Sequence, residues 1–121
     1  MLLQGRVAFL PGAGSGSGRA GAIALAREGA AVTVTDLDGT RARSVANEIV
    51  ADGGKAEAIA LDAADEAAVT AAIDMVATRG RLDILHSHAG IQIPGRLTEV
   101  TSDDMDEIGR ASCRERVLVA V

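Results

Sequence analysis

A glycine-rich turn, Pro11–Gly18, carries the clearest chemical signal in this sequence. It follows the apolar run Val7–Leu10 and precedes a segment with helical spacing of apolar residues. Such a turn brings bare backbone N–H groups to a helix N-terminus, where the helix dipole favours an anion, usually a phosphate. A flexible glycine loop is the structural alternative.

The glycines of this turn fit one spacing best. Gly12, Gly16 and Gly18 read Gly-x-x-x-Gly-x-Gly, and a side chain at the helix entrance would block backbone approach to a pyrophosphate. Ser15 and Ser17 lie between these glycines and complete the predicted pyrophosphate cradle. No Gly-Lys-Ser/Thr ending follows, which argues against the P-loop of nucleoside-triphosphate-binding proteins.

Two aspartates follow apolar runs of strand length. Asp36, with Leu37 after it, lies roughly twenty residues beyond the glycines, where a carboxylate accepts from both ribose hydroxyls of an adenosine. That charge would repel a 2′-phosphate, so NAD is favoured over NADP. A turn or cap is the alternative role for Asp36. Asp62, followed by Ala63, either accepts from the adenine amino group or caps a local turn.

Composition limits the class of protein. The 121 residues suit one domain with 48% hydrophobic content, and a net charge of -5 argues against nucleic-acid binding. The lone Cys113 excludes an internal disulfide, and no Cys/His spacing predicts a metal site. The sequence has neither a signal-peptide pattern nor an apolar run of the roughly 20 residues that a membrane helix needs. We therefore expect a cytoplasmic protein that does not enter membranes.

Short apolar runs alternate with helical segments along the chain. This alternation predicts an α/β, doubly wound Rossmann-type parallel sheet, truncated after about four strands. Asp38 and Asp65 are the expected N-caps of the second and third helices. In the first helix, Ala20, Ile23 and Ala24 are the expected inward residues, with Ala26 as a further candidate. The predicted strands span 7–10, 31–35, 56–61 and 82–85; the predicted helices span 17–28, 40–51 and 66–78, with another opening at Thr101 or Ser102.

Four motifs together resemble the N-terminal half of a short-chain dehydrogenase/reductase: the glycine turn, Asp36, Asp62-Ala63, and the run 82–91 that contains Ser87-His88-Ala89-Gly90. The resemblance covers about residues 3–106. It implies strand order 3-2-1-4, a pyrophosphate on the glycine turn, adenosine at the two aspartates, and the nicotinamide ribose near the backbone of His88 and Gly90.

The sequence departs from the family pattern at three places. Pro11 replaces a usual Thr and removes a backbone N–H. Ser17 replaces a customary Ile, and Ser87-His88 replace two asparagines. These departures predict weaker cofactor binding than is usual in the family. We interpret His88 as a tolerated substitute, with a new catalytic base as the alternative.

The resemblance implies an intact protein that interconverts a small-molecule alcohol and a carbonyl with NAD, as a homo-oligomer. In the family, a Ser and a Tyr-x-x-x-Lys pair perform the chemistry. This sequence has no tyrosine, and its only lysine is Lys55, so no catalytic residue is predicted. Two alternatives remain open: a methyltransferase-like domain that binds S-adenosylmethionine, and a non-catalytic nucleotide-binding module.

The segment 107–121 does not continue the pattern, so the predicted domain spans 1–106. Ile108–Val117 can be written as codons ATC GGA AGA GCG TCG TGT AGG GAA AGA GTG, which read as a common short-read sequencing adapter. We hypothesise that adapter sequence is joined here to a truncated reading frame, which predicts poor stability for the isolated chain. The alternative is a genuine short protein whose basic tail forms a solvated helix end.

Overall fold

Four parallel strands form one sheet in the order β3-β2-β1-β4. The computed structural model describes residues 1–89 and 96–112. The predicted fold class and strand order are confirmed. β-Branched residues form much of β2, as suits a buried strand. The strands are β1 Val7–Leu10, β2 Ala31–Asp36, β3 Lys55–Ala60 and β4 Ile84–Leu85.

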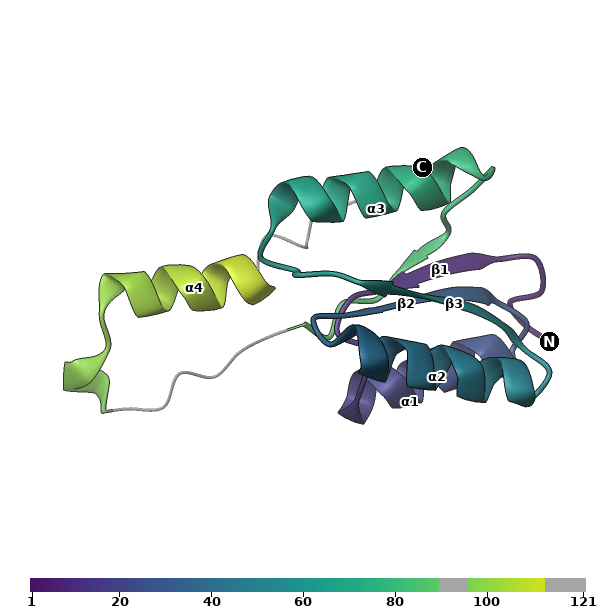
Figure 1. The fold of residues 1–121 in the computed structure, drawn as a ribbon, viewed down its shortest axis with the longest axis horizontal. Coiled ribbons are helices and arrows are strands. Elements are labelled where there is room, and N and C mark those ends of the chain that lie inside the picture. Colours follow the sequence, from purple (N-terminus) through teal and green to yellow (C-terminus); the bar gives the residue numbers. More distant parts are fainter. Residues whose placement is uncertain (90–95, 113–121) are drawn as a thin grey trace.

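Helices cover both faces of this sheet. Figure 1 shows α1 and α2 on one face and α3 on the other, with α4 beyond the carboxyl ends of the strands. Asp38 and Asp65 cap α2 and α3 by accepting backbone N–H groups, as predicted. Gly29 and Gly53 follow α1 and α2 with positive φ, which ends each helix. The helices are α1 Gly16–Arg27, α2 Gly39–Ala51, α3 Glu66–Thr78, the 3-10 turn η1 Leu97–Glu99 and α4 Ser102–Ser112.

Two apolar clusters lie on opposite sides of the sheet. One joins β1 and β2 to α1 and α2 through small side chains such as Ala22, Val34 and Ala46. The other surrounds Phe9, which is fully buried beneath residues of α3 such as Val76. Because most of these side chains are Ala or Val, the helices and the sheet must approach closely.

The inward face of α1 differs in part from the prediction. Ala26 is buried, as predicted, but Ala20 and Ala24 are exposed and Ile23 is only half-buried. The other buried residues of α1 are Gly18 and Ala22. A Cβ at Gly18 would overlap the carbonyl oxygen of Gly12, so the glycine faces the turn and fixes the rotation of the helix. Packing against the turn, rather than side-chain hydrophobicity, selects this face.

Candidate cofactor site

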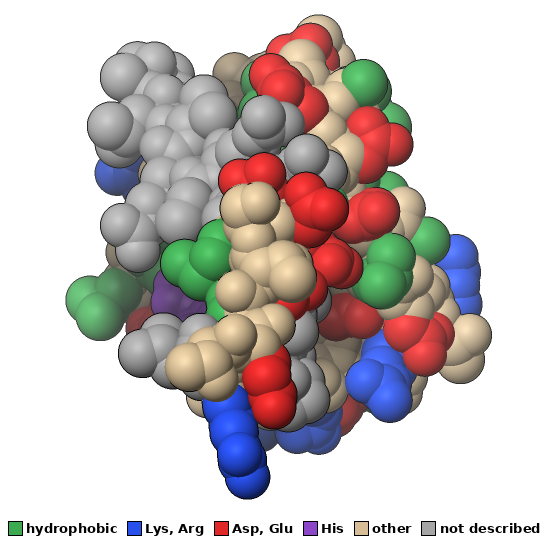
Figure 2. All heavy atoms as spheres, turned by 90° about the vertical axis from the view of Figure 1, so that its left-hand side faces the viewer, with side chains coloured by type: hydrophobic (Ala, Val, Ile, Leu, Met, Phe, Trp, Pro, Cys, Tyr) green, Lys and Arg blue, Asp and Glu red, His purple; other side chains and the backbone are tan. Residues whose placement is uncertain are grey.

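A groove of about 230 Å³ opens at the carboxyl ends of the strands. This is where ligands bind in open parallel sheets. Acidic side chains gather on the face of the molecule at this end (Figure 2). The groove brings together most of the residues predicted from sequence. Its lining comprises Gly12, Ser15, Thr35, Asp36, Leu37, Leu61, Asp62, Ala63, Ala64, His88 and Ala89. The predicted Gly90 lies outside the described residues.

The glycines of the turn meet different requirements. Gly12 has a φ of 72°, and a Cβ there would overlap the backbone of His88 and Ala89. The His88 N–H donates to the carbonyl oxygen of Pro11 at 2.9 Å, which ties the turn to the segment after β4. Gly16 has a φ of 57°, and a Cβ on it would point into open space. Gly12 therefore serves both close packing and a left-handed backbone conformation, whereas Gly16 serves the backbone conformation alone.

The N-terminus of α1 differs from those of α2 and α3. Ser15 is its N-cap, yet no side chain accepts a hydrogen bond there. Asp38 and Asp65 supply that hydrogen bond in α2 and α3. Ser15 and Ser17 are both exposed. The first N–H groups of α1 are thus available to an anion, which the helix dipole would favour.

The Asp36 carboxylate is fixed between two backbone donors. Its Oδ2 accepts from the Gly14 N–H at 3.0 Å, and its Oδ1 accepts from the Asp38 N–H, also at 3.0 Å. The second bond is the turn role that the sequence left open. A carboxylate has about four acceptor positions, so each oxygen can accept a further hydrogen bond. Asp36 can therefore hold the turn and still receive donors from a ligand.

Gly14 is the site residue that the sequence pattern missed. A Cβ on Gly14 would lie 2.6 Å from Asp36 Oδ2 and 2.9 Å from Arg41 Cβ. Any side chain at this position would displace the carboxylate. Every second residue from Gly12 to Gly18 is a glycine, and only the approach of β2 to the turn distinguishes the role of Gly14.

Asp62 has the geometry of a turn residue. Its Oδ1 accepts from the Ala64 N–H at 2.9 Å, and its carbonyl oxygen accepts from the Asp65 N–H at 3.0 Å. Asp62 is nevertheless exposed and lines the groove, as does Leu37, which is 75% exposed. The groove therefore offers both an apolar surface and a carboxylate to a ligand.

Two histidines follow β4 at the groove. The rings of His86 and His88 lie with centroids 4.5 Å apart and planes tilted by 44°. Both residues are exposed, and the His86 ring faces Gly21 of α1. His88 lines the groove, and its N–H donates to the carbonyl oxygen of Pro11.

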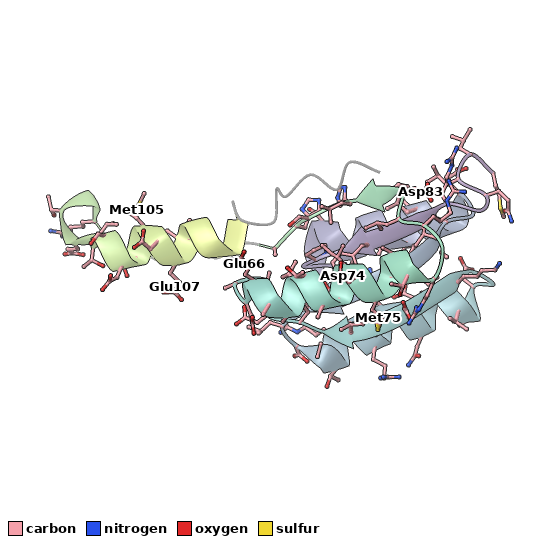
Figure 3. All side chains as sticks on the ribbon, turned by 90° about the horizontal axis from the view of Figure 1, so that it is seen from above. Glu66, Asp74, Met75, Asp83, Met105 and Glu107 are labelled. Atoms are coloured by element: carbon pink, nitrogen blue, oxygen red, sulfur yellow. The ribbon has the colours of Figure 1, made fainter. Side chains whose placement is uncertain are left out.

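A different carboxylate anchors the far end of the sheet. Asp83 accepts from Arg81 and from the Val7 N–H, and these hydrogen bonds lower its pKa to about 2. Arg79 similarly lowers the pKa of Glu57 on β3. In Figure 3, Asp83 lies away from Glu66, where α3 begins, and towards the other end of that helix. The Arg79–Glu57 pair joins the end of α3 to β3, and the Arg81–Asp83 pair lies in the connection before β4. None of these four residues lines the groove.

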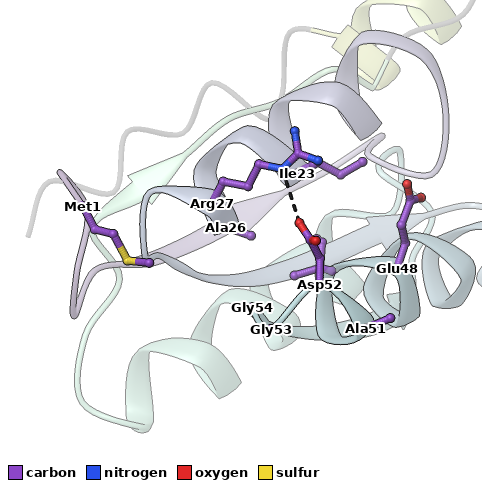
Figure 4. Close-up of a pocket in the computed structure, with 10 residues that line it drawn as sticks. Met1, Ile23, Ala26, Arg27, Glu48, Ala51, Asp52, Gly53 and Gly54 are labelled. Carbon is purple, nitrogen blue, oxygen red and sulfur yellow. Dashed lines mark hydrogen bonds and ion pairs between the residues drawn. The ribbon is translucent and has the colours of Figure 1, made fainter.

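A larger hollow of about 390 Å³ lies between the C-terminal parts of α1 and α2 (Figure 4). Arg27 and Asp52 form an ion pair of 3.4 Å across it. This hollow lies away from the carboxyl ends of the strands. The N–H groups of Gly53 and Gly54, which line it, already donate to carbonyl oxygens of α2. The smaller groove is therefore the candidate site.

Within residues 1–89 and 96–112, no helix has the length and apolar character needed to span a membrane. In the same ranges, no group of three His, Cys, Asp or Glu side chains converges as a metal site would require.

Comparison with known proteins identifies relatives across nearly all of this chain. A family model for short chain dehydrogenases matches residues 6–113. Versicolorin reductase stcU of Emericella nidulans is 39% identical over 120 residues, which cover 98% of this chain and 46% of the relative. D-threitol dehydrogenase of Mycolicibacterium smegmatis is 40% identical over 105 residues, which cover 86% of this chain and 40% of the relative. The chain thus spans about half the length of these relatives.

Solved structures show the same similarity. A short-chain dehydrogenase/reductase from Serratia marcescens superposes with a TM-score of 0.88 at 39% identity, covering 95% of this chain and 48% of that one. A 7 alpha-hydroxysteroid dehydrogenase, solved with NADH and 7-oxo glycochenodeoxycholic acid, has a TM-score of 0.86 at 32% identity, covering 93% of this chain and 44% of that one.

Proposed function

This chain belongs to the short-chain dehydrogenase family, whose members bind NAD(P)(H), and we propose that it forms the NAD-binding part of an oxidoreductase. The complete protein would transfer hydride between NAD(H) and an alcohol or carbonyl group of a small molecule. The family assignment leaves the S-adenosylmethionine-binding alternative without support. A nucleotide-binding module without catalysis remains the second candidate, because the sequence has no tyrosine.

One observation carries the proposal: the N-terminus of α1, which no side chain caps, and the Asp36 carboxylate border the same groove. Backbone N–H groups beside Gly16, together with Ser15, Ser17 and Gly18, would hold the pyrophosphate. Asp36 would accept from the adenosine ribose hydroxyls. Leu37 and Ala63 would flank the adenine, with Asp62 beside it. The backbone at His88 would approach the nicotinamide ribose.

The charge of Asp36 supports NAD rather than NADP. Two like charges about 4 Å apart near a protein surface repel by about 4 kcal/mol before salt screening. The ribose hydroxyls of NAD instead donate to the carboxylate. The acidic character of this face adds to the repulsion of a 2′-phosphate (Figure 2).

The residues present account for binding and orientation. When bound, the nicotinamide supplies the position that accepts or releases hydride. The Gly14 N–H orients Asp36, and the bond from His88 to Pro11 fixes the turn. The family resemblance assigns proton transfer to a Tyr-x-x-x-Lys pair. The only lysine here, Lys55, begins β3, so residues outside this sequence would transfer the proton.

Equilibrium titration of the full chain with NADH, NADPH and S-adenosylmethionine tests the proposal. The chain has no Trp or Tyr, so protein fluorescence does not obscure that of the nucleotide. We expect NADH to bind more tightly than NADPH, and Asp36→Asn to reduce this preference by about tenfold or more. Asp74→Asn on α3 makes the same charge change outside the groove and should leave it unaltered. The proposal would be refuted if circular dichroism shows that the chain is folded and the titrations show that it binds neither NADH nor NADPH.

A further inference from the structure

We propose that His86 and His88 form a two-histidine site for an exchangeable divalent transition-metal ion of the Ni²⁺, Cu²⁺ or Zn²⁺ class. The site lies on the segment that follows β4, beside the glycine turn. Two histidines alone match none of the closed zinc patterns, so the sequence predicted no metal site. The inference concerns imidazole ligands only and does not depend on nucleotide binding.

The backbone after β4 places the two side chains on one face. The His86 N–H donates to the Phe9 carbonyl oxygen at 3.1 Å, and the His88 N–H donates to the Pro11 carbonyl oxygen at 2.9 Å. These bonds extend the parallel pairing of β4 with β1 beyond Leu85. Because side chains alternate between faces along an extended segment, residues 86 and 88 project to the same face.

The two rings have the spacing of ligands that share one ion. Their centroids lie 4.5 Å apart, with planes tilted by 44°. An imidazole nitrogen binds these ions at about 2.0–2.1 Å, so two rings on one ion have centroids about 4.5–5 Å apart. Both residues are exposed, so each ring can rotate to direct a nitrogen at the same ion. Histidine is visible on the molecular face at this end of the sheet (Figure 2).

The ring nitrogens are available to a ligand. Within residues 1–89 and 96–112, neither imidazole takes part in a hydrogen bond or an ion pair. A Cβ on Gly21 of α1 would lie 3.5 Å from His86 Nε2, so the glycine leaves space beside this nitrogen. Imidazole is a preferred ligand of Ni²⁺, Cu²⁺ and Zn²⁺, whereas Mg²⁺ prefers oxygen. With two protein ligands, water completes the coordination, which suits an exchangeable ion.

Calorimetric titration of the full chain with Ni²⁺, without a histidine tag, tests the site. The chain has only two histidines, and a Cys113→Ser background removes the one thiol that would compete. We expect one ion per chain. His86→Gln or His88→Asn should each weaken binding by about tenfold or more, because each removes one of two linked ligands.

Two controls separate the imidazoles from the acidic side chains of this face. Asp74→Asn removes a carboxylate of α3 and should leave the Ni²⁺ affinity unaltered. Mg²⁺ should give no heat of binding, whereas a site made of carboxylates would accept it.

The ring-proton NMR signals of the two histidines give an independent measurement. Paramagnetic Ni²⁺ should broaden or shift both sets of signals together. Because the fold holds the pair in place, Ni²⁺ should also raise the Tm of the native chain, but not that of either histidine variant. The inference would be overturned if the folded chain does not bind Ni²⁺, if either variant keeps the native affinity, if only one histidine responds, or if Tm does not rise. None of these outcomes bears on NADH binding, which the nucleotide titrations measure.

Discussion

Gly14→Ala is the sharpest test of how the turn positions Asp36. The new Cβ would lie 2.6 Å from Asp36 Oδ2 and 2.7 Å from Asp36 Cγ, well inside the roughly 3.5–4.0 Å of a favourable contact. The carboxylate must move, and its bond from the Gly14 N–H at 3.0 Å is lost. The φ of Gly14 is not positive, so the effect comes from the contact and not from backbone strain.

The size of the effect follows from these contacts. Overpacking of this kind costs about 1–3 kcal/mol, which corresponds to a fall in Tm on the order of 5–15 °C. A displaced carboxylate would also lose a charge-assisted hydrogen bond to the ribose, worth about 1.5–3 kcal/mol. NADH should therefore bind about 10–100-fold more weakly.

Gly21→Ala on α1 is the matched control for this substitution. A Cβ at Gly21 would lie 3.5 Å from His86 Nε2, which is an ordinary contact. Alanine within a helix is more stable than glycine by about 0.5–1 kcal/mol, so Tm should rise with NADH affinity unchanged. Thermal unfolding and NADH fluorescence titration measure both quantities. If Gly14→Ala retained the native Tm and affinity, the proposed role of Gly14 would be wrong; a lower Tm with native affinity would make that role purely structural.

Two further predictions concern the Asp83 carboxylate and the C-terminal segment. Asp83 has a pKa of about 2, below the ordinary 3.8, so its ionised form stabilises the fold above the ordinary value and this contribution is lost as pH falls through about 2. Asp83→Asn should therefore lower Tm at neutral pH, with the difference vanishing towards pH 2 in thermal melts; a constant difference would contradict the ion-pair explanation. The second prediction concerns residues 107–121. If adapter sequence was joined to the reading frame, independent genomic reads across the codon of Asp106 should encode different residues beyond Asp106. Continuous coverage of Ile108–Val117 by such reads would reject the adapter hypothesis.

Sequence patterns predicted the elements well where composition changes sharply. β1 and α3 have the predicted bounds, and the other elements before β4 lie within a residue of theirs. Aspartate caps and glycine stops supply those boundaries, since their chemistry is local. β4 is shorter than predicted, beginning at Ile84 rather than Leu82. Leu82 is instead buried beside Phe9, a tertiary contact that an apolar run does not specify.

The missed features depend on contacts between distant segments. α1 consists largely of alanine and glycine, so its sequence gives little contrast between faces, and contact between Gly18 and the Gly12 carbonyl decides its rotation. Gly14 acquires its role only when β2 brings Asp36 against the turn. Motif spacing thus located the groove, but it could not separate glycines required for conformation from those required for contact.

The adenosine end of the proposed site is assembled from neighbouring connections. The turn after β1, the residues after β2 and those after β3 all line one groove, and the parallel pairing of these strands aligns their carboxyl ends. The proposed hydride transfer would in addition need the Tyr-x-x-x-Lys pair that the family resemblance implies, which this sequence does not contain. Binding and turnover therefore rest on separate sets of residues. Nucleotide affinity, rather than enzymatic rate, is the measurement that tests the geometry of this chain.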